Sequence, residues 1–562
     1  MTAFISLRYG RREKHALVTL EDTDREILYP VLFWENSIGR SRTSDIRIKD
    51  PTVSREHAVL LRRSNGWFIA DTGSKAGVYV NGQQAQGRTP VYIGDQIRLG
   101  LSVLTLRRAD DTTAYSEREY LRYKEAKRES RTVTGSVLLM LITVYILFLT
   151  AEAVLNMNSF APVIAPLGFV TVMWIFYAVS RRFFKRRCFE LEALAFLLSG
   201  TGIILNTVHD QRQSFVQLAA LVLGIIIYCF MLWFIEVPDR VMKWRWLIAV
   251  GALGMLGLTI AIGTNLNGAK NWIVLGPVSV QPAEFVKIAY IFIGASTLDY
   301  LQTRKNLFGF ILVSGMYVGV LVLMSDFGTA VIFFATFLVI AFMRSGDFKT
   351  IILAVTAAAL AVIVVLSVKP YIAARFQAWG HVWEYATEEG YQQVNTLIYS
   401  SSGGLFGVGL SKGCLQYVFA SESDLVFGLA TEELGLIIAV LCGVVIGGLM
   451  LYARAVITRS RSTFYSIAAC SAAGLLVFQA ALNIFGVVDL LPLTGVTLPF
   501  VSYGGSSMAA CWGLLAFIKS ADERTYSHRH AKTVPADDDD DGYERSDDPD
   551  YTDYTEQAYT RI

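Results

Sequence analysis

The chain has few charged side chains and few cysteines for its 562 residues, and both shortages exclude classes of protein. Only 17% of the residues are charged and 53% are hydrophobic, which excludes an ordinary soluble protein. The sequence also lacks a cleavable signal peptide, because the apolar stretch at its start is short and charges follow at once. We therefore expect the first soluble region to stay on the side of the membrane where the chain is made.

The six cysteines exclude a disulfide framework and a cysteine-based metal site, because their spacing is typical of neither. They fall mostly within or beside apolar segments, at Cys188, Cys229, Cys414, Cys442, Cys470 and Cys511. The net charge of +2 indicates little about partners, whereas the distribution of polar residues divides the chain into three regions. Residues 1–130 are charged and strand-like, 134–520 are overwhelmingly apolar, and 521–562 are polar and acidic.

The apolar region contains hydrophobic runs of the ~20 residues that a membrane helix requires. They predict about twelve spans, at 134–155, 162–180, 189–207, 214–237, 244–264, 281–300, 307–324, 327–344, 350–368, 425–453, 464–487 and 493–519. Lys and Arg are concentrated in alternate connections, which sets the orientation. The sequence therefore predicts a multi-pass protein of the cytoplasmic membrane with both termini cytoplasmic and the loop 369–424 outside.

The long polar loop 369–424 is the first place to look for chemistry. It carries three carboxylates, Glu384, Glu388 and Glu389, together with His381 and several aromatic residues. Loops longer than ~12–15 residues are usually functional or disordered, and a disordered linker is poor in aromatics. A solvated acidic turn is the alternative interpretation of the carboxylates, and His381 is better explained as an interfacial or structural histidine.

The second half of this loop contains a helical pattern. Tyr391, Val394, Leu397 and Ile398 recur at helical spacing, which predicts a short helix lying in the membrane interface. Glycines after it would let the backbone turn close to a substrate. A flexible connector is the alternative.

Ionisable residues within the predicted spans indicate function, because they are costly to insert. Glu284 and Lys287 share one helix face and could pair, or they could lie near the outer interface and extend toward water. Asp326 lies where two spans meet and could instead be a helix N-cap. The segment 491–507 is rich in prolines and glycines, and such irregular backbone is tolerated at membrane depth only inside protein or beside a wet cavity. A small-residue helix-packing seam around Gly504 and Gly505 is the alternative, which explains the glycines but not the preceding Pro-x-Thr-Gly.

Seven short motifs, taken in order, resemble those of the SEDS family (shape, elongation, division and sporulation proteins, FtsW/RodA-like). They are Asn271-Trp272…Gln281-Pro-x-Glu284-x-x-Lys287, Asp326-Phe-Gly-Thr329, Gly390-Tyr391-Gln392, Gly407-x-Gly409-x-x-Lys412, Asp424-x-x-Phe427, Glu432-Glu433-x-Gly435 and Pro492-x-Thr-Gly495-x-x-Leu-Pro499-Phe-x-Ser502-Tyr503-Gly504-Gly505-Ser506. The similarity covers roughly residues 190–520. Family members have about ten spans, so the two spans within 134–188 are an addition to the domain at 189–520.

The resemblance implies a peptidoglycan glycosyltransferase that polymerises lipid II outside the cytoplasmic membrane, in cell division or elongation. A lipid II flippase and a non-catalytic scaffold of the cell-division complex are the alternatives. Glycosyl transfer needs a general base for the acceptor hydroxyl and cations for the diphosphate leaving group. A class B penicillin-binding protein (a transpeptidase) is the partner that the resemblance implies, and no nucleic acid is expected.

The resemblance also assigns residues, with one departure. The family's catalytic aspartate corresponds to Tyr385, so we assign the base to its neighbour Glu384, with Glu388 and Glu389 in reserve, because a tyrosine with a pKa of ~10 is a poor base. The residues proposed to contact the substrate or its undecaprenyl diphosphate are Glu284, Lys287, Asp326, Arg375, Lys412, Asp424 and Ser502. A divalent cation (Mg or Mn) could assist, although no ligand cluster demands one.

Residues 1–110 predict a small β-sandwich, because short alternating runs are separated by Asn-Gly turns. Residues 30–106 resemble a forkhead-associated (FHA) domain, which binds phosphothreonine peptides. The phosphopeptide-binding residues that we assign are Arg40, Ser54, Arg55 and Lys75. The family's asparagine is Ala76 here, and Lys75 could compensate by reaching the phosphate. The partner would be a phosphothreonine protein or a substrate of a Ser/Thr kinase, and a domain used only for protein docking is the alternative.

Two further segments complete the predicted organisation. Residues 111–133 form a basic linker before the membrane, and 521–562 form an acidic cytoplasmic tail that should be disordered. The predicted fold is therefore a multidomain chain: an all-β sandwich, an all-α polytopic membrane bundle and a disordered tail.

Overall fold

The computed structural model describes most of the chain. The described residues are 16–108, 135–183, 188–299, 304–345, 376–457 and 462–522, with 352, 354–356, 359, 460 and 525, apart from 17, 24, 26, 42, 43, 64, 65, 267, 268, 276 and 277. The predicted linker 111–133, most of the predicted span 350–368, Arg375 and almost all of the predicted acidic tail lie outside these residues.

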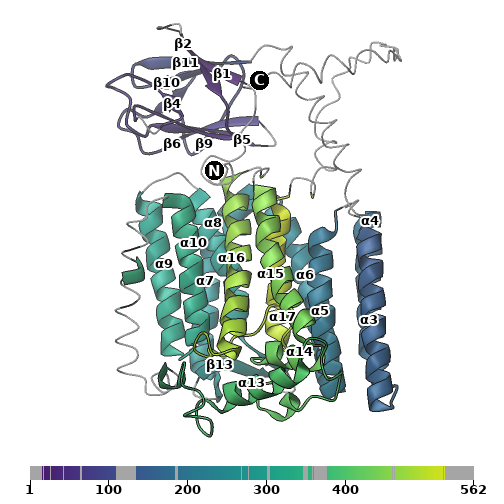
Figure 1. Ribbon diagram of the computed structural model, residues 1–562. Helices are drawn as coiled ribbons and strands as arrows, with labels where there is room; N and C mark the ends of the chain where they lie inside the picture. The colour runs from purple at the N-terminus through teal and green to yellow at the C-terminus, as the bar shows by residue number, and fades with distance from the viewer. Residues whose placement is uncertain are drawn as a thin grey trace, which may run out of the picture. The chain divides into compact units, whose positions relative to one another are not determined.

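The N-terminal region forms the predicted β-sandwich of two sheets (Figure 1). One sheet has the order β2 (Ile27–Val31), β1 (Val18–Asp22), β11 (Ser102–Arg108), β10 (Gln96–Leu99), β7 (Val78–Val80) and β8 (Gln83–Gln84), and the other has the order β4 (Ile46–Arg47), β3 (Glu35–Gly39), β5 (Ala58–Arg63), β6 (Gly66–Asp71) and β9 (Arg88–Val91). Alternate residues of β11 face the core, so that Leu104 and Leu106 are buried. The all-β prediction is confirmed.

The rest of the described chain is helical, with one small three-stranded sheet. The helices are α3 (Gly135–Met157), α4 (Ile164–Phe183), α5 (Glu190–His209), α6 (Gln211–Ile235), α7 (Pro238–Ile262), α8 (Pro282–Asp299), α9 (Arg304–Leu323), α10 (Phe327–Ser345), α13 (Tyr391–Gly403), α14 (Val426–Glu433), α15 (Leu436–Ile457), α16 (Thr463–Val487) and α17 (Gly505–Ser520), with the 3-10 helices η1 (Ala161–Val163) and η2 (Leu415–Tyr417). The sheet consists of β12 (Thr264–Leu266), β13 (Ala269–Leu275) and β14 (Val278–Val280).

Among the described residues, 7 helices are long and apolar enough to cross a membrane, and two shorter apolar helices lie at Gly309–Leu323 and Phe327–Met343. This composition identifies a membrane protein, as the sequence predicts. The number of about twelve spans stays a prediction, since the segment 350–368 is almost entirely outside the described residues.

Two of the predicted spans are not continuous helices over their whole length. The span predicted at 425–453 is interrupted between α14 and α15, where Gly435 has a φ of 93°. A helix cannot continue through this left-handed conformation, and a β-carbon at Gly435 would collide with the carbonyl oxygen of Leu405. The span predicted at 493–519 is helical only from Gly505, because the preceding prolines and glycines form irregular backbone.

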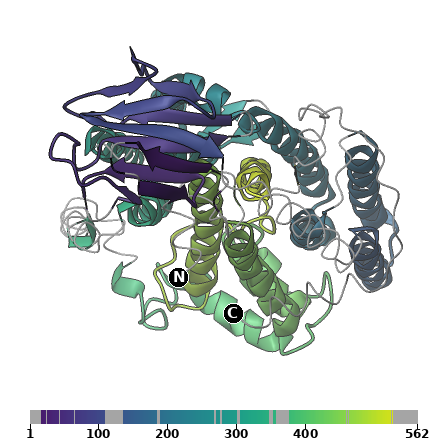
Figure 2. The same cartoon turned by 90° about the horizontal axis from the view of Figure 1, so that it is seen from above.

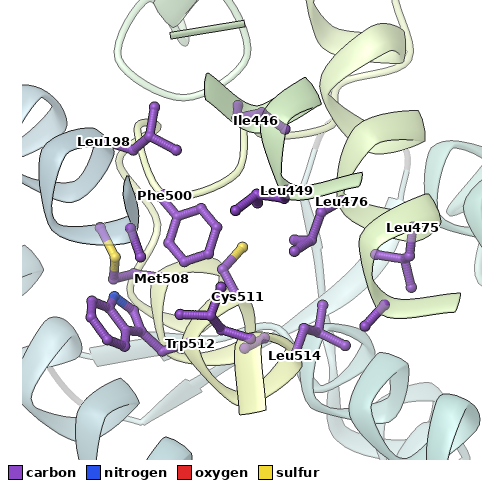
Figure 3. Packing of buried hydrophobic residues seen from close by; sticks show 14 of the residues in the cluster. Leu198, Ile446, Leu449, Leu475, Leu476, Phe500, Met508, Cys511, Trp512 and Leu514 are labelled. Atoms are coloured by element: carbon purple, nitrogen blue, oxygen red, sulfur yellow. The ribbon is translucent and has the colours of Figure 1, made fainter. Parts of the chain in front are cut away.

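The hydrophobic core of the bundle is built around α17, which lies in the middle when the helices are viewed end on (yellow in Figure 2). Small residues of α17, among them Gly505, Ala509 and Ala510, let neighbouring helices approach closely. Trp512 is fully buried and packs edge-on against Phe500 and Tyr228, with the Phe196 ring centroid 4.8 Å away. Figure 3 shows the surrounding leucines, with Met508 and Cys511 filling the space between helices.

Candidate active site

The segments β13, α13 and α14 lie at the same end of the helices (Figure 1), which we call the α13 end. The long polar loop is described from Phe376, where a series of turns leads to α13, then to η2 and α14. The short helix predicted from Tyr391, Val394, Leu397 and Ile398 is confirmed as α13.

Glu384 lies on the surface of this loop. Its side chain is 74% exposed, and its Oε1 lies 3.9 Å from His381 Nδ1, which is a weak contact. Glu388 and Glu389 are also exposed. The proposed base and its two reserve residues are therefore accessible to a substrate, and they lie apart from the buried ionic residues of the bundle.

Backbone hydrogen bonds fix the turn that carries Glu384. The amide of Gly390 donates to the carbonyl oxygen of Tyr385 at 3.1 Å. A β-carbon at Gly390 would lie 2.5 Å from the carbonyl oxygen of Val382, so only glycine lets the two backbones approach. This close approach gives a physical reason for the glycine of the Gly390-Tyr391-Gln392 motif.

The loop is also bound to the end of α16 and to the connection that follows it. The indole Nε1 of Trp379 donates to the carbonyl oxygen of Leu490 at 3.3 Å, and the amide of Gly380 donates to a carboxylate oxygen of Asp489 at 3.2 Å. Gln393 on α13 donates to the carbonyl oxygen of Gly486 at 3.0 Å. Glu384 is therefore carried by a segment that is fixed to the bundle.

Glu284 and Lys287 form the predicted pair, and both side chains are buried inside the bundle. Lys287 Nζ lies 2.7 Å from Glu284 Oε1 and 2.9 Å from Gln479 Oε1, and the lysine is 1% exposed. Gln479 in turn donates to the carbonyl oxygen of Thr497 at 2.9 Å. Lys287 therefore connects α8, through α16, to the irregular segment before α17, and the alternative of residues extending toward water is wrong.

Asp326 is both a helix cap and a link between elements. Its Oδ1 accepts from the amide of Thr329 at 3.2 Å at the start of α10. Its Oδ2 accepts from the side chains of Asn271 on β13 at 3.1 Å and Gln281 beside α8 at 3.2 Å. The carboxylate thus brings together residues of the first two sequence motifs.

Ser502 and Asp424 belong to a second cluster at the α13 end. The Ser502 hydroxyl donates to the carbonyl oxygen of Ser423 at 2.5 Å and accepts from the amide of Leu498 at 2.8 Å. The carbonyl oxygen of Asp424 accepts from Asn483 on α16 at 2.8 Å. Ser502 therefore holds the irregular segment 498–504 against the loop, which is a structural use of the hydroxyl.

Glu432, Glu433 and His209, which sequence reasoning left without a role, organise the same end. Both carboxylate oxygens of Glu432 accept backbone amides, from Cys414 at 2.7 Å and from Leu415 at 2.9 Å. His209 Nε2 lies 3.3 Å from Glu433 Oε1, and both side chains are buried. The Glu432-Glu433 motif indicated their importance, but His209, the partner of Glu433, lies far away in the sequence. Lys412 precedes the Glu432-bound turn and is exposed.

Burial also changes the pKa of Glu422, which lies beside this cluster. It raises the pKa of Glu422 above the ordinary 4.5, although His209 opposes the shift. The carbonyl oxygen of Glu422 accepts from the amide of Tyr503 at 2.8 Å, so the residue touches the irregular segment. The pKa of Tyr503 is raised by burial and by Glu422.

A largely apolar cavity of about 360 Å³ opens next to α13. It lies between α13, α14 and the nearest ends of α15 and α16, and it is lined by Thr396, Ser400, Leu405, Phe427, Leu436 and Val487 among others. Among the residues that the structure describes, no three His, Cys, Asp or Glu side chains gather to hold a metal ion.

The residues assigned to phosphopeptide binding converge at one edge of the β-sandwich. The amide of Arg40 donates to the carbonyl oxygen of Ser54 at 3.0 Å, and the amide of Lys75 donates to the Ser54 hydroxyl at 3.1 Å. His57 is buried: its Nδ1 accepts from the amide of Ser54 at 3.0 Å, so that Nε2 donates to the carbonyl oxygen of Gly77 at 3.1 Å. Arg40, Arg55 and Lys75 are exposed around this point.

Fold and site together define a polytopic membrane protein with a carboxylate-bearing loop, joined to a small β-sandwich. The profile of the FtsW/RodA/SpoVE family, described as "Cell cycle protein", matches residues 188–527, and that of the FHA domain matches residues 36–100. The chain belongs to the FtsW/RodA/SpoVE family and carries an FHA domain.

Individual relatives agree with this assignment. A probable peptidoglycan glycosyltransferase FtsW of Coxiella burnetii is 36% identical over 290 residues, which cover 49% of this chain and 77% of the relative. The peptidoglycan glycosyltransferase RodA of Mycobacterium tuberculosis is 28% identical over 386 residues, 63% of this chain and 81% of the relative. One similar solved structure is a chain of a peptidoglycan synthase complex that coordinates polymerization and crosslinking. Its TM-score is 0.50 and its sequence identity is 25%, and the match covers 59% of this chain and 96% of that chain.

Proposed function

We propose that this chain is a peptidoglycan glycosyltransferase that polymerises lipid II at its α13 end, under the control of a phosphothreonine-reading FHA domain. The observation that carries this function is the family match across residues 188–527, whose relatives are named as peptidoglycan glycosyltransferases. The loop anchored at the α13 end adds an accessible carboxylate at a fixed position.

The proposed orientation places the α13 end outside the cytoplasmic membrane and both termini inside. It rests on the concentration of Lys and Arg in alternate connections. The FHA domain then lies on the side where kinases act, and the loop lies on the side where lipid-linked sugars are joined.

In the proposed reaction, Glu384 removes the proton from the acceptor sugar hydroxyl as that oxygen attacks the anomeric carbon of the donor. The transition state has oxocarbenium character, and a nearby carboxylate stabilises it. The undecaprenyl diphosphate leaves with the bonding electrons, and exposed cations neutralise it. Lys412 suits that role by its exposure, and Arg375 remains a proposed second cation.

The structure supports different roles for the remaining predicted substrate residues. Lys287 is already bound by Glu284 and Gln479, so we propose that it supports the irregular segment rather than the diphosphate. The same holds for Ser502, whose hydroxyl is engaged on both sides. We keep Asp326 and Asp424 as proposed substrate contacts. Mg or Mn assistance is a proposal that omission and chelation of divalent cations would test.

The experiment uses the purified full-length chain and fluorescently labelled lipid II. We expect the wild type to give a ladder of glycan strands and Glu384→Gln to give none, at an unchanged protein level. Glu388→Gln and Glu389→Gln are the matched controls on the same loop and should polymerise. A Glu384→Gln enzyme with wild-type ladders would remove the base assignment, and leaflet exchange without any ladder would favour the flippase.

The FHA domain needs its own test, because Ala76 replaces the family's asparagine. We expect the full-length chain to bind peptides from a phosphothreonine library, and Arg40→Ala to lose that binding. Arg107→Ala is the charge-matched control, since Arg107 lies on β11 and contacts Glu21. Absence of wild-type binding would leave the domain as a protein-docking module.

The proposed partners follow from the same assignments. A class B penicillin-binding protein would crosslink the strands that this chain makes. The similar solved chain comes from a peptidoglycan synthase complex that coordinates polymerization and crosslinking. Co-purification of a transpeptidase with the full-length chain would support this partner.

A further inference from the structure

Helix α3 lies outside the family match, yet it contacts the loop at the α13 end. The family match begins at residue 188, and α3 ends at Met157. Glu152 and Asn156 are one helical turn apart on α3, so they share a face. The amide of Leu410 donates to Glu152 Oε1 at 3.3 Å, and Asn156 Nδ2 donates to the carbonyl oxygen of Leu410 at 3.0 Å.

Both hydrogen bonds are made with the backbone of Leu410 and not with its side chain. The donor and the acceptor of this one residue are both bound by α3, while the leucine side chain is fully buried in the core. A buried backbone group without a partner is unfavourable, so Glu152 and Asn156 replace partners that regular secondary structure would supply.

The segment that they hold has three residues in left-handed conformations, of which Ser411 is strained. Gly407 and Gly409 have φ values of 84° and 100°, and Ser411, which is not a glycine, has a φ of 67°. A left-handed non-glycine residue persists only where its surroundings hold it in place. The amide of Lys412 donates to the carbonyl oxygen of Gly409 at 3.2 Å, which closes the turn directly before the exposed lysine.

Helix α3 is itself fixed to the bundle, so it can act as a rigid support. Ile146 and Leu149 are buried on its inner face. Tyr145 OH lies 3.3 Å from Thr201 Oγ1 on α5, and Trp174 on α4 donates to Thr143 at 3.0 Å. Helix α3 therefore links α5 to the loop through its hydrogen bonds with Leu410.

We propose that Glu152 and Asn156 are positioning residues, which hold the turn 407–412 so that Lys412 is presented to the diphosphate of the lipid-linked substrate. This inference rests on the proposed function, and it gives helix α3 a role in positioning a substrate-binding residue. Neither residue touches substrate; both act through the backbone of Leu410.

The test compares lipid II polymerisation by full-length variants. Glu152→Ala removes the acceptor and Asn156→Asp removes the donor, so each should raise KM for lipid II roughly tenfold while kcat changes less than about threefold. Glu152→Gln keeps an oxygen acceptor and should restore most of the wild-type KM. Leu155→Ala is the control, because this neighbour on α3 is 76% exposed and makes no proposed contact.

A double variant separates positioning from a general loss of packing. Lys412→Ala alone should raise KM, and Glu152→Ala combined with Lys412→Ala should be no worse than Lys412→Ala. Additive effects, a wild-type KM in Glu152→Ala, or a Glu152→Gln variant as impaired as Glu152→Ala would overturn the proposal.

A wild type that makes no glycan strands would count against the proposed function but not against the positioning role. Hydrogen exchange tests the positioning role in that case. The amides of Leu410 and Lys412 should exchange at least about fivefold faster in Glu152→Ala and Asn156→Asp than in the wild type and in Leu155→Ala. Unchanged exchange at both amides would overturn the positioning role.

Discussion

Lys287 shows how a charged residue is accommodated inside this bundle. It is 1% exposed and bound by Glu284 and Gln479, so its ammonium group has two partners in place of water. Removing one partner of a buried ion pair leaves an uncompensated charge, whereas replacing both is often tolerated.

The first prediction follows from this asymmetry. Lys287→Met should lower the free energy of unfolding by about 3–5 kcal/mol, because Glu284 is left buried and unpaired. The double variant Glu284→Gln with Lys287→Met should recover most of that loss. Thermal unfolding of the detergent-purified variants measures both, and a double variant less stable than Lys287→Met would contradict the explanation.

Glu422 gives a prediction of pH dependence at the same scale. Burial raises its pKa above 4.5, so the folded chain holds the proton more tightly than the unfolded chain. The contribution to stability is therefore present below pH 4.5 and is lost as the pH rises through the folded-state pKa. Glu422→Gln cannot ionise, so its melting temperature should match the wild type near pH 4 and exceed it at pH 7.

Thermal scans of the wild type and Glu422→Gln across that pH range check this expectation. Glu388→Gln changes an exposed carboxylate on the same loop and should give no such gain. A melting temperature for Glu422→Gln that stays below the wild type at pH 7 would show that its contacts outweigh the burial of its charge.

The limits of sequence analysis are visible at these residues. The i,i+3 spacing predicted the Glu284–Lys287 pair, because both residues lie on one turn of α8. The third partner, Gln479, is on α16, and nothing local in the sequence connects it to Lys287. Glu384 was assigned through the family motif, and no described contact distinguishes it from its exposed neighbours except the weak pair with His381.

At the scale of elements, glycines decide where the helices at the α13 end begin. Gly435 has a φ of 93° and separates α14 from α15, which apolar composition alone predicted to be one span. A hydrophobic run indicates where a helix is favourable in a membrane. It does not indicate whether a residue within the run adopts a left-handed backbone conformation. The helix α13 was predictable because its pattern is amphipathic.

A substitution at Gly435 tests this element boundary. Gly435→Ala should destabilise the protein by at least ~1–3 kcal/mol, since alanine disfavours this φ and its β-carbon would collide with the backbone of Leu405 and Phe406. Gly447→Ala is the matched control within α15, because a β-carbon there meets open space. That control should keep or slightly raise the melting temperature; equal losses in both variants would contradict the role of Gly435.

At the scale of the whole molecule, the two described domains were predictable for different reasons. The β-sandwich follows from alternating strands and Asn-Gly turns, and the membrane bundle follows from long apolar runs. The contact between α3 and the long polar loop could not be predicted, because Glu152 and Leu410 are far apart in the sequence and the family match begins only at residue 188, after α3.

Gel analysis of the products that the purified full-length chain forms from labelled lipid II tests the central claim most directly. The wild type should produce a ladder of glycan strands, and Glu384→Gln should produce none while Glu388→Gln still does. A folded wild type without any ladder, when supplied with lipid II and divalent cations, would contradict the glycosyltransferase function.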